Sequence, residues 1–178
     1  MRYDMQWTFL VFLIVLMLSC ISCDEPLQPS SFGTSKLSIV INEFLASNTQ
    51  TNIDEAGEYD DWIELYNTSD SSVLLQNIYL TDSLNYPNRW RMPDTTIAPR
   101  GYLLVWTDNQ PQGKLHATFR LDKEGEQIGI FVQQDGEFSV IDSLTFRQQR
   151  SDTSYGRFPD GESQWSFFPA PTPGAGNR

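Results

Sequence analysis

The sequence predicts an all-β fold, a sandwich or a barrel, from three observations. After residue 36, apolar and polar residues alternate in short segments with the period of two that half-buried strands show. Turn residues such as Gly, Pro, Asn and Asp separate these segments at spacings of about ten residues, as in sandwiches and barrels. No stretch after residue 36 combines a helical period with capping residues.

The first expected strand covers residues 37–43, with Leu37, Ile39 and Ile41 on one face. Continuing this alternation would turn Glu43 toward the interior. A buried carboxylate needs hydrogen-bond partners, and an extra residue in a strand reverses its alternation. We therefore expect a β-bulge or a hydrogen-bonded carboxylate at Asn42 and Glu43.

Three further strands follow in order. Residues 62–66 place Ile63 and Leu65 on one face, and the strand around residues 78–80 obeys the same rule. Residues 102–106 are apolar without interruption and follow the turn at Pro99–Gly101, which predicts a central strand buried on both faces.

The clearest local element is a hairpin. Residues 128–132 and 138–141 have strand patterns, and Asp135 and Gly136 lie between them. An Asp-Gly pair readily supplies the positive φ angles of a tight primed turn, so these two strands are expected to pair directly.

The N-terminal segment predicts export and lipidation. Residues 7–18 are almost all apolar, a length that suits a secretion signal better than a bilayer-spanning helix. Ser19 precedes Cys20 as in a bacterial lipoprotein processing site, so Cys20 is the expected lipidation site, with Cys23 as the alternative. A disulfide between these two cysteines and an uncleaved membrane anchor are the other interpretations. Asp24 and Glu25 resemble the acidic export tags of some surface lipoproteins.

Charge limits the partners. The chain has 23 Asp and Glu against 12 Lys and Arg, a net charge of −11. Nucleic-acid binding draws much of its affinity from Lys and Arg that neutralise phosphates, and no basic stripe is present here. We therefore expect no nucleic-acid partner.

Several segments together resemble the lamin-tail domain family, which has an immunoglobulin-like β-sandwich fold. The resemblance extends from Ile39 to Asn177. It is carried by Ile41–Asn48, Asp60–Asn67, Ile78–Asp82, Ile97–Tyr102, Leu115–Leu121, Gly125–Ile128, Ser154–Gly161 and Pro171–Gly174. Asn77 and Arg100 stand at turns where this family often has glycine. The resemblance implies an attachment module, as on the secreted and surface proteins of bacteria that carry this domain.

No catalytic constellation emerges from the residues. The one histidine, His116, would have to be the base of a Ser/His/Asp hydrolase, but a structural imidazole at a strand start is the favoured explanation. Zinc sites need three or four Cys, His or carboxylate ligands, and no cysteine follows residue 23. We predict that the protein is not an enzyme.

Two candidate binding features remain. Asp54, Glu55, Glu58 and Asp60 lie in one acidic loop with Gly57 between them, and such a loop can fold carboxylates around Ca²⁺ or simply be a solvated surface. Of the tryptophans, Trp62 and Trp106 are expected in the core. Trp90 is the expected partly exposed aromatic, available for contact with a ligand or packed at the edge of the core.

The predicted organisation is a lipoprotein signal peptide (1–19), a flexible, disordered tether (20–36) and a lamin-tail immunoglobulin-like domain (37–178). The predicted function is a non-catalytic, lipid-anchored adhesion or scaffold module of the cell envelope that presents its β-sandwich to proteins or glycans. The expected location is the cell envelope, anchored by lipid at the outer membrane, with the domain on either the periplasmic or the surface side. The alternative is a carbohydrate-active protein, either a glycan-binding module or a weak glycan hydrolase.

Overall fold

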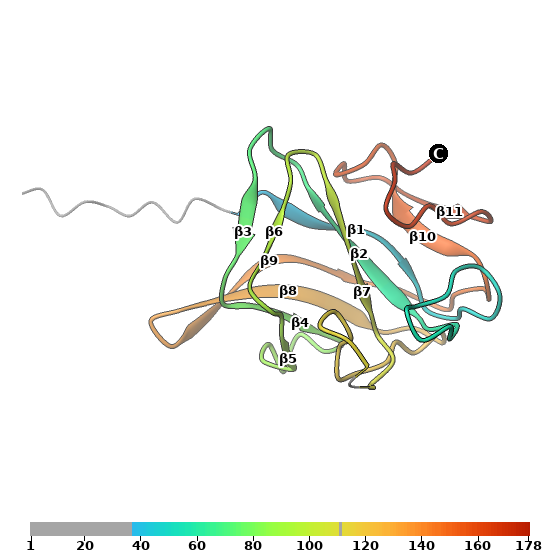
Figure 1. Ribbon diagram of the computed structural model, residues 1–178, viewed down its shortest axis with the longest axis horizontal. Helices are drawn as coiled ribbons and strands as arrows, with labels where there is room; N and C mark the ends of the chain where they lie inside the picture. Colours follow the sequence, from blue (N-terminus) through green and yellow to red (C-terminus); the bar gives the residue numbers. More distant parts are fainter. Residues whose placement is uncertain (1–36, 111) are drawn as a thin grey trace, which may run out of the picture. The chain divides into compact units, whose positions relative to one another are not determined.

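The protein is an all-β structure whose antiparallel strands form two main sheets and one small sheet (Figure 1). This computed structural model describes residues 37–110 and 112–178. The expected all-β sandwich class is confirmed in this part of the chain. Within these two ranges, no helix is long and apolar enough to cross a bilayer. The predicted signal peptide, Cys20 and Cys23 lie outside the described residues.

The first main sheet has five strands in the order β11-β10-β1-β2-β7. These are β1 (Ile39–Leu45), β2 (Trp62–Asn67), β7 (Tyr102–Trp106), β10 (Ser154–Arg157) and β11 (Trp165–Phe168). The second main sheet has the order β5-β4-β8-β9, formed by β4 (Ile78–Thr81), β5 (Trp90–Arg91), β8 (Gln127–Gln134) and β9 (Glu137–Thr145). The small sheet pairs β3 (Val73–Leu75) with β6 (Thr95–Ile97).

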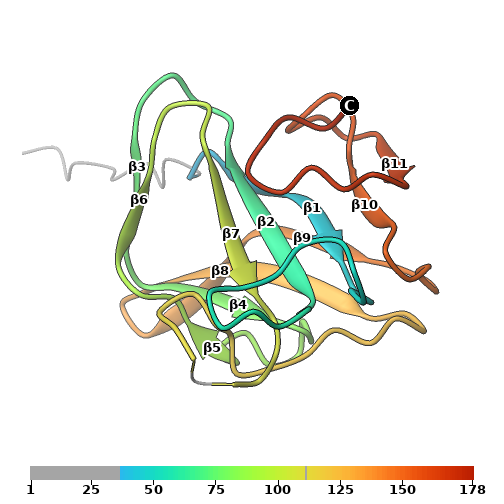
Figure 2. The same ribbon diagram turned by 45° about the vertical axis from the view of Figure 1, so that its right-hand side comes forward.

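The main hydrophobic core lies between the two main sheets, whose strands run in different directions (Figure 2). One layer contributes β1 and β2 side chains such as Ile41 and Leu65, and the other contributes β4 and β8 side chains such as Leu80 and Ile130. All four are fully buried. Two sheets that each bury one face against the other form a sandwich.

The predicted bulge is present in β1. Ile41 pairs with Leu65 but Glu43 pairs with Glu64, so Asn42 is the extra residue. The bulge reverses the alternation, which keeps Phe44 in the core and turns Glu43 to the outer face of the sheet. Both alternatives of the prediction are therefore confirmed, because the Glu43 carboxylate also accepts hydrogen bonds from Thr172.

The outer face of the five-stranded sheet is covered as well, which the alternation in β2 did not predict. Every residue of β2 is buried. Leu45, Trp62 and Trp106 form a second small cluster on this face, and the Trp62 indole N–H donates to Asn52 Oδ1 at 2.8 Å. The β1–β2 loop thus closes over Trp62, and the predicted burial of Trp62 and Trp106 is confirmed.

The prediction that residues 102–106 form a central strand is wrong. β7 is the edge strand of the five-stranded sheet. It is apolar on both faces because Val105 packs into the main core, whereas Leu104 packs against the Trp62 cluster. Tyr102 stacks on Tyr66 with a centroid distance of 4.9 Å.

The predicted hairpin is confirmed and is longer than expected. β8 and β9 pair from Gln127 to Thr145, and the turn residues Asp135 and Gly136 have φ angles of 51° and 87°. Asn77 and Arg100 also have positive φ angles, 54° and 53°. Glycine adopts such angles most easily, which accounts for its frequency at these turns in the family that the sequence resembles.

The C-terminal segment crosses the outer face of β1 and β2 and completes a buried polar network. Its amide groups and hydroxyls bond to two buried carboxylates: Thr172 donates to Glu43 and the Gly174 N–H donates to Glu64. Burial raises the pKa of Glu43 and raises that of Glu64 to about 8, although hydrogen bonds to both carboxylates oppose the shift. The network joins the chain end to the first two strands.

Candidate functional site

The candidate site lies where the β1–β2 loop meets the connection between β7 and β8. Backbone bonds position the two segments: the Thr107 N–H donates to Asp61 O and joins them, and the Ala117 N–H donates to Trp106 O and holds the connection against the end of β7, both at 2.8 Å. These bonds place residues 54–60 beside residues 108–116, which are far apart in the sequence.

His116 is the centre of this site. Its side chain is completely buried, with Nδ1 2.6 Å from Asp108 Oδ2 and Nε2 3.0 Å from Glu55 Oε1. Nε2 is at ion-pair distance from Glu55, but the contact does not have the geometry of a hydrogen bond. Burial acts to lower the pKa of His116, but the hydrogen bond and charge of Asp108, with a contribution from Glu55, outweigh burial and raise it above 6.5.

Asp54 enters the site from the acidic loop. Its Oδ1 accepts the backbone N–H groups of Ala56 at 2.9 Å and Glu58 at 2.7 Å, which fixes the loop around this carboxylate. Its Oδ2 is buried and has no hydrogen-bond partner. Asp60 Oδ2 is likewise buried and has no hydrogen-bond partner. The loop therefore presents carboxylate oxygens that its own backbone does not satisfy.

The carboxylates and the imidazole converge at distances suitable for metal ligands. Ligand atoms of Asp54, Glu55 and His116 lie within 4.8 Å of one another, and so do those of Asp54, Glu58 and Asp60. We call the six residues Asp54, Glu55, Glu58, Asp60, Asp108 and His116 the His116 cluster. Burial and the charges of Asp108, Asp54 and Glu58 raise the pKa of Asp60.

The structure thus brings together the four residues predicted as calcium ligands, but in two groups that share Asp54. Glu55 faces His116, and not Glu58 and Asp60. Sequence reasoning missed Asp108 and treated His116 as a residue at a strand start. His116 forms only an isolated bridge with Trp106. The available signal was a lone histidine eight residues after Asp108, which closely follows an apolar strand pattern.

Gly113 keeps the space beside His116 open. A Cβ atom at this position would lie 2.8 Å from His116 Cδ2 and would collide with Glu55 Oε1. The first distance is shorter than side-chain carbons normally approach, and the ring is fixed by Asp108. Glycine is therefore required here by close packing.

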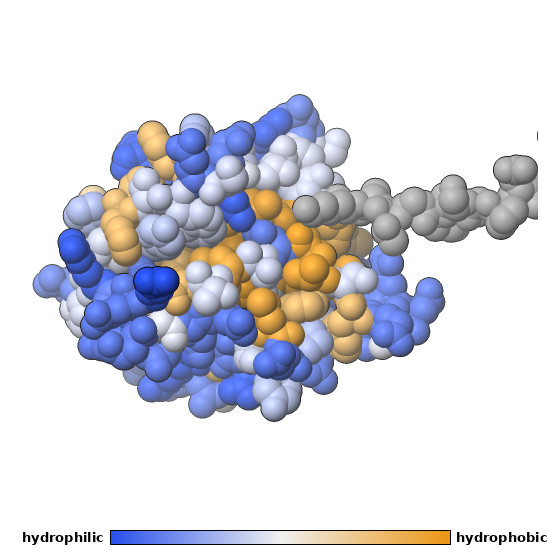
Figure 3. Space-filling model, turned by 180° about the vertical axis from the view of Figure 1, so that it is seen from behind, coloured by the Kyte–Doolittle hydropathy of each residue, from blue (hydrophilic) through white to orange (hydrophobic). Residues whose placement is uncertain are grey.

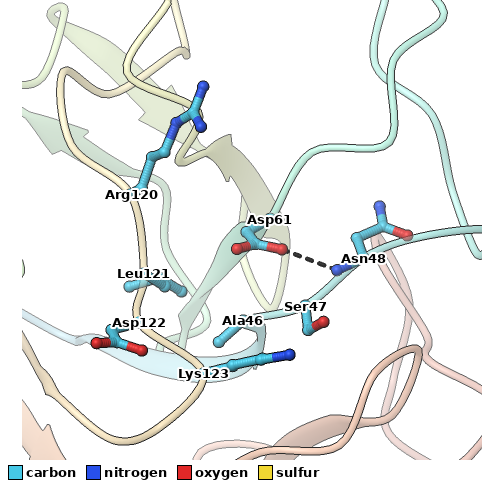
Figure 4. A pocket seen from close by; sticks show the side chains of 8 residues that line it. All are labelled: Ala46, Ser47, Asn48, Asp61, Arg120, Leu121, Asp122 and Lys123. Carbon is cyan, nitrogen blue, oxygen red and sulfur yellow. Dashed lines mark hydrogen bonds between the residues drawn. The ribbon is translucent and has the colours of Figure 1, made fainter.

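A polar groove of about 470 Å³ lies next to this site and is lined by Ala46, Ser47, Asn48, Asp61, Arg120, Leu121, Asp122 and Lys123 (Figure 4). Asp61 accepts the Asn48 N–H at 2.8 Å, and burial raises its pKa to about 6. Arg120 and Asp122 bring opposite charges to the groove. Its walls show no convergence of ligand atoms like that of the His116 cluster.

A separate aromatic platform lies on β10 and β11. Tyr155 stacks on Trp165 at 5.3 Å and contacts Phe167 at 4.6 Å, and the Arg157 guanidinium lies 4.9 Å from the Trp165 ring centre. Phe167 is 48% exposed. We call Tyr155, Arg157, Trp165 and Phe167 the β10–β11 platform. The predicted contact residue Trp90 is half-buried and packs against the main core from edge strand β5.

Comparison with known proteins gives one match. The family model described as Lamin Tail Domain matches residues 33–148, which include the His116 cluster and every strand from β1 to β9. β10 and β11 follow the matched range but belong to the same sheet as β1. No curated protein and no solved structure matches the chain.

Proposed function

The chain belongs to the lamin tail domain family, an immunoglobulin-like family of generally non-catalytic binding or scaffold modules, and on this premise we propose that it is a lipid-anchored adhesion module of the cell envelope. The lipid on Cys20, or on Cys23, holds the protein at the outer membrane. Residues 20–36 act as the tether, and the β-sandwich contacts a protein or glycan partner at the cell surface.

The observation that carries this proposal is the β10–β11 platform. Large aromatic side chains dominate the energetics of contact surfaces, and a half-exposed Phe167 beside Tyr155 and Trp165 offers apolar area that the fold itself does not use. Figure 3 shows that apolar side chains also gather in one area of the face opposite to that of Figure 1, within a hydrophilic surround. Contiguous apolar surface of this kind is typical of interaction sites.

The anchor is tested by metabolic labelling with a clickable palmitate. We expect the unaltered protein to take up the label and a Cys20→Ser, Cys23→Ser double variant to lose it. The two single variants identify which cysteine is modified. Continued labelling of the double variant would contradict the lipoprotein proposal.

The contact surface is tested by cross-linking the protein to its neighbours in intact cells. Phe167→Ser removes the exposed ring of the platform, and Tyr86→Ser removes a more exposed ring from the β4–β5 loop as a matched control. We expect the first variant to reduce cross-linking to envelope components several-fold and the second to leave it unchanged. Equal effects of both variants would argue against the platform.

A glycan partner is a specific form of this proposal, because sugar rings stack on exposed aromatic faces and Phe167 is the exposed ring of the platform. Binding of the purified protein to a glycan array, lost in Phe167→Ser, would support it. Turnover of a glycan substrate that a single carboxylate substitution abolishes would instead support the hydrolase alternative. The net charge of −11 disfavours a nucleic-acid partner in either case.

A further inference from the structure

Two buried ligand-type atoms of the His116 cluster make no hydrogen bond, although one of them, His116 Nε2, lies 3.0 Å from the Glu55 carboxylate. Asp54 is only 7% exposed and His116 only 3%, yet Asp54 Oδ2 and His116 Nε2 make no hydrogen bond. Buried polar groups are nearly always hydrogen-bonded, because desolvation without a partner costs free energy. Asp54 and His116 belong, with Glu55, to one group in which a ligand atom from each residue lies within 4.8 Å of the others, so one ion can reach both side chains.

Each of these side chains is oriented by a contact of its other polar atom. Asp108 contacts Nδ1 of His116, which leaves Nε2 facing Glu55; in the neutral imidazole with its proton on Nδ1, the lone pair lies on Nε2. The two backbone N–H groups on Asp54 Oδ1 likewise leave Oδ2 facing the cluster. A carboxylate that accepts the second N–H of a ligating imidazole is the usual outer partner of a metal-bound histidine, because it fixes the tautomer and raises ligand basicity.

No Lys or Arg side chain balances the negative charge of the cluster in the part of the chain that the structure describes, where its one basic side chain is His116, against Asp108 and Glu55. In residues 37–110 and 112–178, the carboxylates of the cluster form no ion pair with a Lys or Arg side chain. The carboxylates of the cluster are those of Asp54, Glu55, Glu58, Asp60 and Asp108. Carboxylates packed this closely repel one another in a partly desolvated site, and a divalent cation would reverse this repulsion.

We propose that Asp54, Glu55 and Nε2 of His116 bind one divalent transition-metal ion of the zinc class, with Asp108 as the positioning residue for the imidazole. One imidazole nitrogen and two carboxylate oxygens form a ligand set that Zn²⁺ accepts, with water completing a four-coordinate site. Ca²⁺ and Mg²⁺ prefer oxygen ligands only, which favours a transition metal over the calcium predicted from the acidic loop.

The ion would join two loops that the strand pairing already brings together. Asp54 and Glu55 belong to the β1–β2 loop and His116 to the β7–β8 connection, so metal binding would close the second loop against the first. Gly113 packs closely against the His116 ring, and the absence of a side chain at this position leaves the space that the imidazole occupies. The site is separate from the β10–β11 platform and does not depend on the proposed adhesion function.

The test uses the imidazole resonances of the full-length protein. Because the chain has one histidine, long-range ¹H–¹⁵N spectra report on His116 alone, and metal bound at Cys20 or Cys23 does not disturb the measurement. We expect Zn²⁺ to move the Nε2 resonance strongly while Nδ1 remains a protonated donor to Asp108. We expect Ca²⁺ and Mg²⁺, at the same ionic strength, to leave both nitrogens unchanged.

Three variants separate ligation from general electrostatics. Asp54→Asn keeps Oδ1 for the loop backbone, Glu55→Gln changes an exposed side chain, and Glu137→Gln removes an equal charge from exposed β9 as the control. We expect the first two to weaken Zn²⁺ binding at His116 by more than about tenfold and the control to leave it unchanged. No Zn²⁺-dependent change at Nε2, equal weakening by the control, or Ca²⁺ binding without any imidazole change would overturn the proposal.

Discussion

Raising the pH from about 5 to above 8 should destabilise this protein, because Glu64 lies in the buried network beneath the C-terminal segment. The carboxyl is fully buried, and burial raises its pKa from 4.5 in the unfolded chain to about 8 in the fold. Between these two values the folded state binds more protons than the unfolded state. The free energy of unfolding is therefore highest below about pH 4.5, as far as Glu64 is concerned, and falls as the pH rises toward 8.

The size of the effect follows from the shift. Each pKa unit corresponds to about 1.36 kcal/mol, so raising the pH from 5 to 8.5 should cost up to about 4 kcal/mol. This figure is an upper limit for Glu64 alone; Glu43, whose pKa is also raised by burial and whose charge interacts with that of Glu64, changes the stability in the same direction. Asp61, with its pKa raised to about 6, adds to the fall in the same direction.

Urea unfolding of the full-length protein at half-unit steps from pH 5 to pH 8.5 measures this dependence. Glu64→Gln does not titrate and should flatten the curve. It should also lower the absolute stability, because both carboxyl oxygens of Glu64 accept N–H groups, from Asn42 and Gly174, and an amide offers only one acceptor. A stability that is constant or rises with pH in the unaltered protein would refute the reasoning, as would an unchanged slope in the variant.

Three further changes test the packing. Phe44→Ala should lower the free energy of unfolding by about 3–5 kcal/mol in urea titrations, because the ring is fully buried against Phe146 at 4.6 Å. Gly136→Ala should cost about 1 kcal/mol or more by the same measurement, because φ is 87° in the hairpin turn, and unchanged stability would argue against this turn. Gly113→Ala should shift the His116 imidazole resonances in the metal-free protein, whereas Lys114→Ala, at an exposed neighbour, should not.

Alternation predicted the core-facing strands correctly because each buries one face against the opposite sheet. Ile63 and Leu65 in β2, and the hairpin around Asp135, follow from a period of two and one turn. The bulge at Asn42 was predictable for the same reason, since an unbroken alternation would have placed Glu43 in an apolar core. Local pattern is sufficient where a single interface decides which face is buried.

Pattern failed where burial comes from segments outside the sheet. The apolar run of β7 indicated a strand with neighbours on both sides, but its outer face is covered by the Trp62 cluster and the β1–β2 loop rather than by another layer of strands. An apolar run predicts that both faces of a strand are covered. It does not predict whether another strand, a loop or a chain end covers them. The position of β7 at the sheet edge depends on pairing, which composition does not encode.

The candidate site lies beyond sequence reasoning for a related physical reason. Asp54 and Glu55 stand out as part of an acidic loop, but their partner His116 is more than sixty positions away and reaches them only because Thr107 and Ala117 bond to neighbouring backbone at the strand ends. What distinguishes this cluster from a solvated acidic surface is burial without hydrogen bonds at Asp54 Oδ2 and His116 Nε2. That property belongs to the packing of two loops against each other, and residue spacing alone could not separate an oxygen-only calcium loop from a site with an imidazole ligand.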